Sequence, residues 1–294
     1  MHTEAIRLRD EGAEVVVIAP KPSVQGERTF SPGIDVIPIP ALGAFGFPGV
    51  VAKLRREPWR ALGALRFVTA GRAALRQSGP FDRVYAHWAV PCVVPLIDAV
   101  DPIEQPAPVE AISHGADVRL LVGLPAPARH ELLVRIVRRV ETWRFVSSEL
   151  VGSLLRAIGD RELIREIEAR VVVAPSPFLV PDVTDVAASI RRDQGDFVTS
   201  VGRLIPTKHV DKAIRAARAE GRRLVVIGDG PDRSRLEKLA HSLGADVTFK
   251  GMLPREHALA WLAASNGLWF ASTVEGESTV LREARALGRP VRML

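Results

Sequence analysis

The sequence contains one cysteine among its 294 residues, so no disulfide can form within the chain and a reducing compartment is favoured. That residue, Cys92, lies in the apolar run 88–97, where a small buried side chain is a better interpretation than a catalytic nucleophile. Charges occupy the first nine residues, where a signal peptide would be apolar. The least polar run, 86–100, is interrupted by prolines and Asp98 and is too short to span a bilayer. We therefore expect a cytoplasmic protein.

Several ligand-binding motifs are also missing. No Asp-x-Asp pair occurs, so the usual short carboxylate motif for a divalent metal is absent and we expect no metal site. Aromatic residues make up 5% of the chain and no nucleic-acid-binding motif is present, which argues against a nucleic acid partner. The Gly-Asp-Gly-Pro turn at 228–231 lacks the third glycine of the dinucleotide fingerprint, which counts against an NAD site.

The composition is that of a globular chain, with 47% hydrophobic and 25% charged residues, and the length favours two domains. One segment is strongly basic, because residues 53–76 carry seven lysines and arginines against the single acid Glu57. Trp59, Leu62 and Leu65 are interleaved with these charges. The segment is either a solvated basic helix or a helix that lies on an anionic membrane surface, at the inner face of the membrane.

Strand-like and helix-like segments alternate along the chain, which predicts an α/β fold with parallel sheets. We expect strands at residues 15–19, 83–86, 109–113, 143–147, 171–174, 197–201, 224–227, 247–250, 267–270 and 290–293. We expect helices at residues 3–9, within 53–76, at 128–142, 149–158, 231–239 and 254–264, and after 278.

Two segments rich in proline interrupt this alternation, and one of them is expected to separate the domains. Residues 20–48 read as an irregular passage, and residues 177–195 read as a linker between domains at 1–176 and 196–294. In a parallel sheet each helix connects two strands, so an opening helix with no strand before it predicts an incomplete N-terminal domain. A strand directly before residue 294 predicts that the C-terminal domain is incomplete as well.

Ligands of open α/β sheets gather at the carboxyl ends of the strands, and two of the expected strands end in histidines. His87 follows the strand 83–86, and His114 follows the strand 109–113. Gly115 lets the backbone approach a ligand, and Asp117 is placed to orient a nearby donor. A loop histidine is more often incidental than functional, so both interpretations stay open for this pair.

Charged residues in the second half suggest a site for a sugar nucleotide. Arg203 and Lys208 lie after the strand 197–201, where two fixed cations can hold a diphosphate and neutralise it as it leaves, in place of a metal ion. Glu275 and Glu283 bracket the start of the last expected helix, whose backbone N–H groups favour an anion such as phosphate. Carboxylates so placed can accept hydrogen bonds from sugar or ribose hydroxyls. The alternative is that both are solvated acids that favour the helix N-terminus.

Taken in order, these motifs resemble the retaining glycosyltransferases of the GT-B fold, family 4. The resemblance rests on Arg203-x4-Lys208, on Gly228-x-Gly-Pro231, on Glu275-x7-Glu283 followed by Ala-Leu-Gly-Arg-Pro-Val, on Ala86-His87-Trp88 and on His114-Gly115-Ala116-Asp117. It runs over nearly the whole chain, and its specificity lies in the order and spacing of the motifs. One departure is His209, which stands where the family usually has a glycine after the lysine.

The resemblance implies two Rossmann-like domains facing across a cleft, with a nucleotide sugar bound mainly by the C-terminal one. It implies that Arg203 and Lys208 bind the donor diphosphate and that Glu283 binds the ribose, with Gly276 as a further donor-binding residue. Glu275 would bind hydroxyls of the transferred sugar.

On the acceptor-domain side, the resemblance places His114 beside the reacting sugar, so that His114 and Glu275 are the catalytic candidates. His87 and Asp117 are then candidates for the acceptor side. Transfer would retain the anomeric configuration, require neither metal nor cofactor, and extend a glycan, a lipid-linked saccharide or a small acceptor.

Two alternatives to this function stay open. One is another enzyme of the same fold, such as a nucleotide-sugar epimerase or a sugar phosphorylase. The other is an inactive fragment or a nucleotide-sugar-binding subunit.

Overall fold

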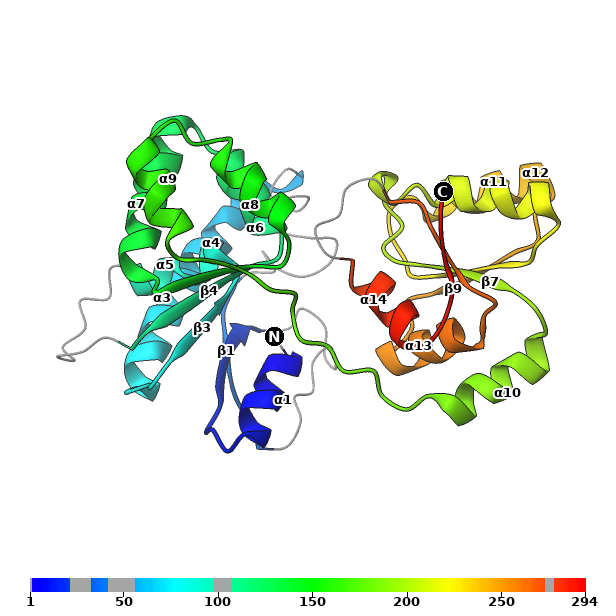
Figure 1. The fold of residues 1–294 in the computed structure, drawn as a ribbon, viewed down its shortest axis with the longest axis horizontal. Helices are drawn as coiled ribbons and strands as arrows, with labels where there is room; N and C mark the ends of the chain where they lie inside the picture. Colours follow the sequence, from blue (N-terminus) through cyan, green and yellow to red (C-terminus); the bar gives the residue numbers. More distant parts are fainter. Residues whose placement is uncertain (1, 22–32, 42–55, 98–106, 273–277) are drawn as a thin grey trace. The chain divides into compact units, whose positions relative to one another are not determined.

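The computed structural model describes residues 2–21, 33–41, 56–97, 107–272 and 278–294. The chain divides into two compact units, Met1–Phe178 (unit 1) and Leu179–Leu294 (unit 2). Both are built from helices and parallel strands (Figure 1), as the sequence predicts.

Unit 1 contains a four-stranded parallel sheet in the order β3-β4-β5-β6 and a separate parallel pair, β1-β2. Its strands are β1 (Val16–Pro20), β2 (Asp35–Ile39), β3 (Val84–His87), β4 (Val109–Ser113), β5 (Thr142–Phe145) and β6 (Val171–Val173). Its helices are α1 (His2–Asp10), η1 (Pro58–Arg60), α3 (Ala61–Ser78), α4 (Ala89–Cys92), α5 (Val94–Ile97), α6 (Ala116–Val122), α7 (Ala126–Arg139), α8 (Ser148–Leu155) and α9 (Arg161–Glu168). The carboxyl ends of β3 and β4 lie side by side, because His87 is in register with Ile112.

The two faces of the four-stranded sheet differ in character. Trp143 and Phe145 of β5 are fully buried in the main core of unit 1, where they pack with Ala111 of β4 and with residues of α6 to α9. Side chains alternate along a strand, so Arg144 faces the opposite side, where its Nε lies 2.6 Å from Glu110 Oε1 on β4. The second face is therefore polar beside the ends of β3 and β4.

Unit 2 contains a five-stranded parallel sheet in the order β11-β10-β7-β8-β9. Its elements are α10 (Thr184–Gln194), β7 (Val198–Val201), η2 (Pro206–Lys208), α11 (Val210–Glu220), β8 (Leu224–Ile227), α12 (Arg233–Leu243), β9 (Val247–Gly251), α13 (Arg255–Ala264), β10 (Leu268–Phe270), α14 (Thr279–Ala286) and β11 (Val291–Met293).

All four residues of β8 are buried, because helices cover both faces of this sheet. Leu224 and Val226 pack with residues of α11 and α12, whereas Val225 and Ile227 pack with residues of α10 and α13. A continuous apolar run of this kind is typical of a parallel strand buried on both sides.

Two sequence predictions of irregular structure are wrong. Residues 184–194, assigned to the linker, form α10, which packs on α13 through Ala187 and Ile190. Val183, Ala187 and Ile190 have helical spacing, but the three prolines just before them led to a linker assignment. Strand β2 lies in the Pro- and Gly-rich passage and pairs in parallel with β1, and its Pro38 is tolerated because, among the described residues, β2 has a partner strand on one side alone.

Candidate functional site

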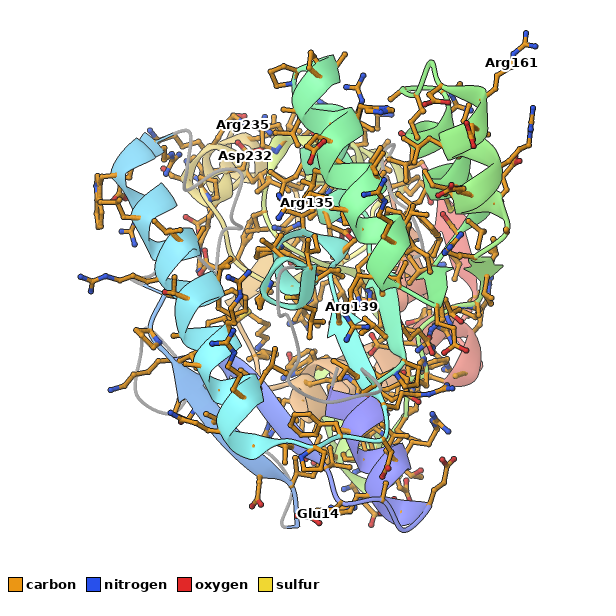
Figure 2. The ribbon with its side chains drawn as sticks, turned by 90° about the vertical axis from the view of Figure 1, so that its left-hand side faces the viewer. Glu14, Arg135, Arg139, Arg161, Asp232 and Arg235 are labelled. Carbon is orange, nitrogen blue, oxygen red and sulfur yellow. The ribbon has the colours of Figure 1, made fainter. Side chains whose placement is uncertain are left out.

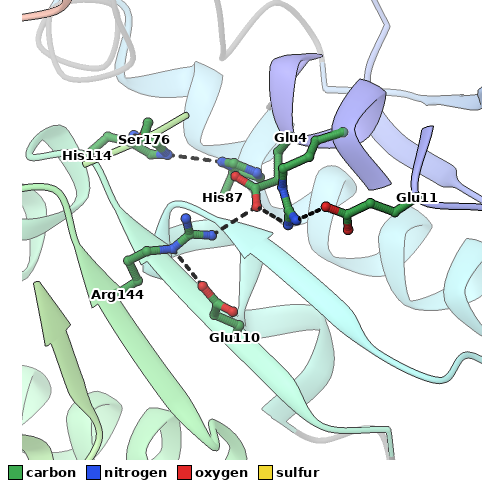
Figure 3. A network of polar contacts seen from close by, with 8 residues as sticks. Glu4, Glu11, His87, Glu110, His114, Arg144 and Ser176 are labelled. Carbon is green, nitrogen blue, oxygen red and sulfur yellow. Dashed lines mark hydrogen bonds and ion pairs between the residues drawn. The ribbon is translucent and has the colours of Figure 1, made fainter. Parts of the chain in front are cut away.

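Two histidines meet at the carboxyl ends of β3 and β4. His87 ends β3, His114 follows β4, and Nδ1 of His87 lies 3.0 Å from Nε2 of His114 (Figure 3). The two ring planes are nearly parallel, at 10°, and the centroids lie 5.3 Å apart, so the rings meet edge to edge through this contact. On its other side, Nδ1 of His114 lies 3.4 Å from the hydroxyl of Ser176. The structure therefore brings together two residues that the sequence placed on separate strands.

Both imidazoles are held in the neutral form. Burial lowers the pKa of His87 to about 2, and the neighbouring positive charge of Arg144 adds to this shift. Burial also lowers the pKa of His114, although the charge of Asp117 acts in the opposite direction. A neutral pair can exchange hydrogen bonds with hydroxyl groups, but it brings no positive charge to a reacting centre.

The Asp117 carboxylate connects the loops that carry these histidines. It is fully buried: Oδ1 accepts from the backbone N–H of His114 at 3.2 Å and of Gly115 at 3.0 Å, and Oδ2 accepts from that of Ala89 at 3.0 Å. The sequence predicts that Asp117 orients a donor on the acceptor side. In the structure its donors are backbone groups, so its carboxylate joins the loops after β3 and β4.

Trp88, between His87 and Ala89, has a φ of +78°, a value that is uncommon for a residue other than glycine. Its backbone N–H donates to the Ile112 carbonyl oxygen at 2.8 Å. The turn after β3 is thus tied to β4 on one side of Trp88 and to Asp117 on the other, and these bonds stabilise the unusual conformation.

A network of charged residues surrounds the polar face beside His87 (Figure 3). Arg144 contacts Glu110 and, through Nη2 at 3.3 Å, Glu4 of α1, which is 4% exposed. Glu4 also pairs with Arg7 at 3.2 Å. Sequence reasoning missed this network, although Glu110 and Arg144 stand out as charges inside apolar strands.

Cys92 is a free cysteine in a partly buried position. It packs at the edge of the main core, and burial raises the pKa of its thiol to about 12, with a further contribution from the charge of Asp117. The prediction of a structural cysteine is confirmed.

In unit 2, the loops after β7 and β8 pack backbone against backbone. The N–H of Gly202 donates to the Ile227 carbonyl oxygen at 2.9 Å, and that of Leu204 donates to the Asp229 carbonyl oxygen at 2.9 Å. A Cβ on Gly228 would lie 2.0 Å from the Gly202 oxygen, and one on Gly230 would lie 2.2 Å from the Leu204 oxygen. Glycine is therefore required at both positions of the Gly-Asp-Gly-Pro turn.

This packing fixes the loop that carries the two candidate cations. Arg203 is exposed, and Lys208 is partly exposed at the end of η2. His209 follows with φ +47° and ψ +39°, a left-handed conformation that glycine adopts more readily. A glycine would meet this conformation with less strain, and here a histidine adopts it.

The loop after β10 approaches the same loop. The Ser272 hydroxyl lies 3.4 Å from the Thr207 carbonyl oxygen, next to Lys208. The chain then continues towards Glu275 and Gly276, which lie outside the described residues. Ser278 precedes the first residue of α14, as the sequence predicts.

Glu283 lies in the second turn of α14, and its side chain is 12% exposed. Its Oε1 accepts two hydrogen bonds from Arg255 of α13, from Nε at 3.2 Å and from Nη2 at 2.9 Å. The sequence identified the glutamate but not its arginine partner, because the two residues are 28 positions apart.

No group of three or more histidine, cysteine, aspartate or glutamate side chains suited to a metal ion occurs within the described ranges. Within those ranges, too, no helix combines the length and the apolar character needed to cross a bilayer.

Comparison with known proteins finds a family model that is similar to part of the second half of the chain. Residues 184–291 match the family model described as glycosyl transferases group 1. The GDP-mannose-dependent alpha-(1-6)-phosphatidylinositol monomannoside mannosyltransferase of Mycobacterium tuberculosis (strain CDC 1551 / Oshkosh) is 40% identical over 110 residues, which cover 32% of this chain and 28% of that protein. The chain thus matches less than a third of the length of this relative.

Solved structures extend the similarity to the whole chain. Sucrose-phosphate synthase from Thermosynechococcus elongatus matches with a TM-score of 0.71 at 19% identity, over 98% of this chain and 73% of that one. Anabaena HepE, solved with UDP and glucose, matches with a TM-score of 0.62 at 16% identity, over 95% of this chain and 80% of that one. The fold is that of the GT-B glycosyltransferases, and the match to the glycosyl transferases group 1 model lies within unit 2.

Proposed function

We propose that this chain transfers a sugar from a nucleotide-diphosphate sugar to a glycan, a lipid-linked saccharide or a small acceptor, with retention of configuration and without a metal. The observation that carries the proposal is the match of residues 184–291 to glycosyl transferases group 1, over the part of the chain that contains the candidate donor residues. The GT-B fold of the whole chain supports the same conclusion.

The proposed donor site is formed by the loops after β7 and β10 and by α14. Arg203, Lys208 and Gly276 bind the diphosphate, Glu283 binds ribose hydroxyls, and Glu275 binds hydroxyls of the transferred sugar. Two fixed cations stabilise the negative charge that develops on the departing diphosphate, a role that a metal ion plays in other transferases.

The proposed acceptor side is the histidine pair of unit 1. His114 binds a hydroxyl close to the reacting sugar through Nδ1, in place of its long 3.4 Å contact with Ser176, and His87 supports it through the hydrogen bond to Nε2. Because both rings are neutral, they orient hydroxyl groups rather than neutralise the leaving group. Asp117 holds both loops, as its three backbone hydrogen bonds indicate.

The nucleotide of the donor is best sought among the nucleotides that the similar proteins use. The relative from Mycobacterium tuberculosis is named as GDP-mannose-dependent, and HepE was solved with UDP. We therefore propose GDP-mannose and UDP-glucose as the first donors to test.

The transfer assay uses radiolabelled donor, EDTA, and two acceptors, free monosaccharides and phosphatidylinositol in detergent. We expect a glycoside whose anomeric configuration, read by NMR, is that of the donor. Free sugar phosphate or an isomerised nucleotide sugar without glycoside would instead support the phosphorylase or epimerase. Donor binding without any product would support the binding subunit or inactive fragment.

We also propose that unit 1 contacts an anionic membrane through η1 and α3. Trp59, Leu62 and Leu65 are 54%, 60% and 60% exposed and follow one another at helical spacing. Arg66 and Arg76 are exposed on the same helix, and Figure 2 shows side chains of α3 projecting outward. Exposed apolar residues beside basic ones are typical of a helix that lies in a lipid interface.

Sedimentation with vesicles tests the membrane contact. We expect binding to vesicles that contain phosphatidylserine, weakened by salt and by the triple change of Trp59, Leu62 and Leu65 to Ser. Met252→Ser is the control, since Met252 is 63% exposed and lies in unit 2. Equal binding of the triple variant and the control would contradict the contact.

A further inference from the structure

The Glu283 carboxylate is held by one side chain from another helix. Both hydrogen bonds from Arg255 go to Oε1, so Oε2 is not used by this pair. The glutamate side chain is 12% exposed, whereas that of the arginine is 49% exposed. Arg255 thus covers one oxygen of a largely buried carboxylate from the solvent side.

A third hydrogen bond fixes the guanidinium itself. Nη2 of Arg255 also donates to the Leu179 carbonyl oxygen at 2.7 Å, and Leu179 is the first residue of unit 2. Because the guanidinium is planar and its donors have fixed directions, two acceptors from different segments restrict its orientation. The orientation of the Glu283 carboxylate is restricted with it.

We propose that Arg255 is a positioning residue, which sets Glu283 to accept hydrogen bonds from the two adjacent hydroxyls of a ribose. This inference rests on the proposed function, in which Glu283 contacts the nucleotide. Pairing with Arg255 balances the charge of Glu283, so the carboxylate neither attracts a cation nor repels the nearby diphosphate. Its Oε2 then recognises a neutral ligand that carries hydroxyl groups.

If the Arg255–Glu283 ion pair only stabilised the fold, its loss would have a different effect on ligand binding. An ion pair whose arginine is half-exposed stabilises a fold only slightly, and its loss would weaken all ligands of the unit to a similar extent. A positioning role instead predicts that the loss falls on ligands with ribose hydroxyls. The ratio between the affinities for a ribonucleotide and its dideoxy analogue separates the two roles.

The experiment is calorimetric titration of the full chain with UDP, GDP and ADP and with the 2′,3′-dideoxy form of whichever binds. The variants are Arg255→Ala, Arg255→Lys and Glu283→Gln. Arg191→Ala is the matched control, because Arg191 also bonds a carboxylate, Asp196 at 3.2 Å, and a carbonyl oxygen, Ala264 at 3.1 Å, and is 46% exposed.

We expect wild type and Arg191→Ala to prefer the ribonucleotide. Arg255→Ala should bind it about tenfold more weakly while binding the dideoxy form as wild type does, so that the preference disappears. Arg255→Lys, which keeps the charge without the two-donor geometry, should lose most of the preference, as should Glu283→Gln.

Two outcomes would overturn the inference in different ways. A preference that survives in Arg255→Ala, or an equal loss for both forms, would remove the positioning role while leaving the donor site intact. A folded wild-type chain that binds none of the three diphosphates would contradict the proposed function itself, and the inference would fail with it.

Discussion

Gly228 and Gly230 lie at positions where there is no room for a side chain. Each lies where a Cβ would overlap a carbonyl oxygen of the loop after β7, the loop that carries Arg203 and Lys208. The fingerprint of this turn is weak in sequence because many strand-to-helix turns contain glycine. In the structure both glycines are required, because the backbones of the loops after β7 and β8 approach each other closely.

Replacing Gly228 by Ala should therefore displace this loop. Gly244 is the matched control, because both glycines have positive φ, at +128° and +57°, but a Cβ on Gly244 meets nothing within 4 Å. We expect Gly244→Ala to lower the free energy of unfolding of unit 2 by about 1 kcal/mol and Gly228→Ala by about 3 kcal/mol. Denaturant unfolding measures both, and equal losses would contradict the close approach.

The buried His87 links stability to pH. Its pKa is about 2 in the folded protein, against an ordinary value of 6.5. Below pH 6.5 the unfolded chain binds a proton that folded His87 does not bind, so stability falls as the pH falls from 6.5 towards 2. Above pH 6.5 both states are neutral and the contribution is fully retained.

His87→Gln should flatten this acid dependence. Between pH 4 and 6 we expect the slope of unfolding free energy against pH to decrease by up to about 1.4 kcal/mol per pH unit, the value for one proton. His241→Gln, at an exposed ring of α12, is the control. Parallel curves for wild type and His87→Gln would show that His87 is not buried as described.

At the scale of elements, the loops after β3 and β4 are joined by one side chain of α6. Asp117 accepts three backbone hydrogen bonds from these loops and has no exposed surface. Asparagine in its place has one oxygen instead of two, and its amide hydrogens would face a backbone donor.

Asp117→Asn should lower the unfolding free energy of unit 1 by about 3 kcal/mol, because a buried N–H loses a charged acceptor. Asp182→Asn is the control, since exposed Asp182 accepts from the Thr184 N–H at 3.0 Å and asparagine can do the same. Thermal unfolding followed by circular dichroism compares them. Similar stability of the two variants would show that the Asp117 bonds do not hold the loops.

Elements with a strong periodic signal were predictable from the sequence. The strands at 84–87, 109–113, 224–227 and 268–270 follow from apolar runs with turn residues beside them, and their parallel pairing follows from the intervening helices. Helix α10 was missed because proline density outweighed a short apolar spacing, and β2 because a proline lies within it.

The sequence suggests several residues of the candidate site, but it does not show which of them contact one another. His87 and His114 are suggested by their positions at strand ends, yet their 3.0 Å contact depends on the parallel pairing of β3 and β4. Arg255 gives no sequence signal, because its role depends on the packing of α13 beside α14. The sequence shows Asp117 as a polar residue close to His114, but only the structure shows that it is buried and that its partners are backbone groups.

At the scale of the whole molecule, the two units present candidate residues of different charge. Unit 1 offers a neutral histidine pair, and unit 2 offers two cations and a paired carboxylate. This difference in charge agrees with the proposal that unit 2 binds the donor and unit 1 the acceptor. A diphosphate requires cations, whereas an acceptor hydroxyl requires neutral hydrogen-bonding groups.

The central claim is that unit 2 binds a nucleoside diphosphate without a metal. The most direct measurement is calorimetric titration of the full chain, in EDTA, with UDP, GDP and ADP. The comparison includes Lys208→Ala, Glu283→Ala and, as control, Lys212→Ala at an exposed lysine of α11. We predict saturable binding of one diphosphate that weakens at least about tenfold in the first two variants and is unchanged in the control. Equal affinity in all four proteins, or binding that requires an added divalent metal, would contradict the account.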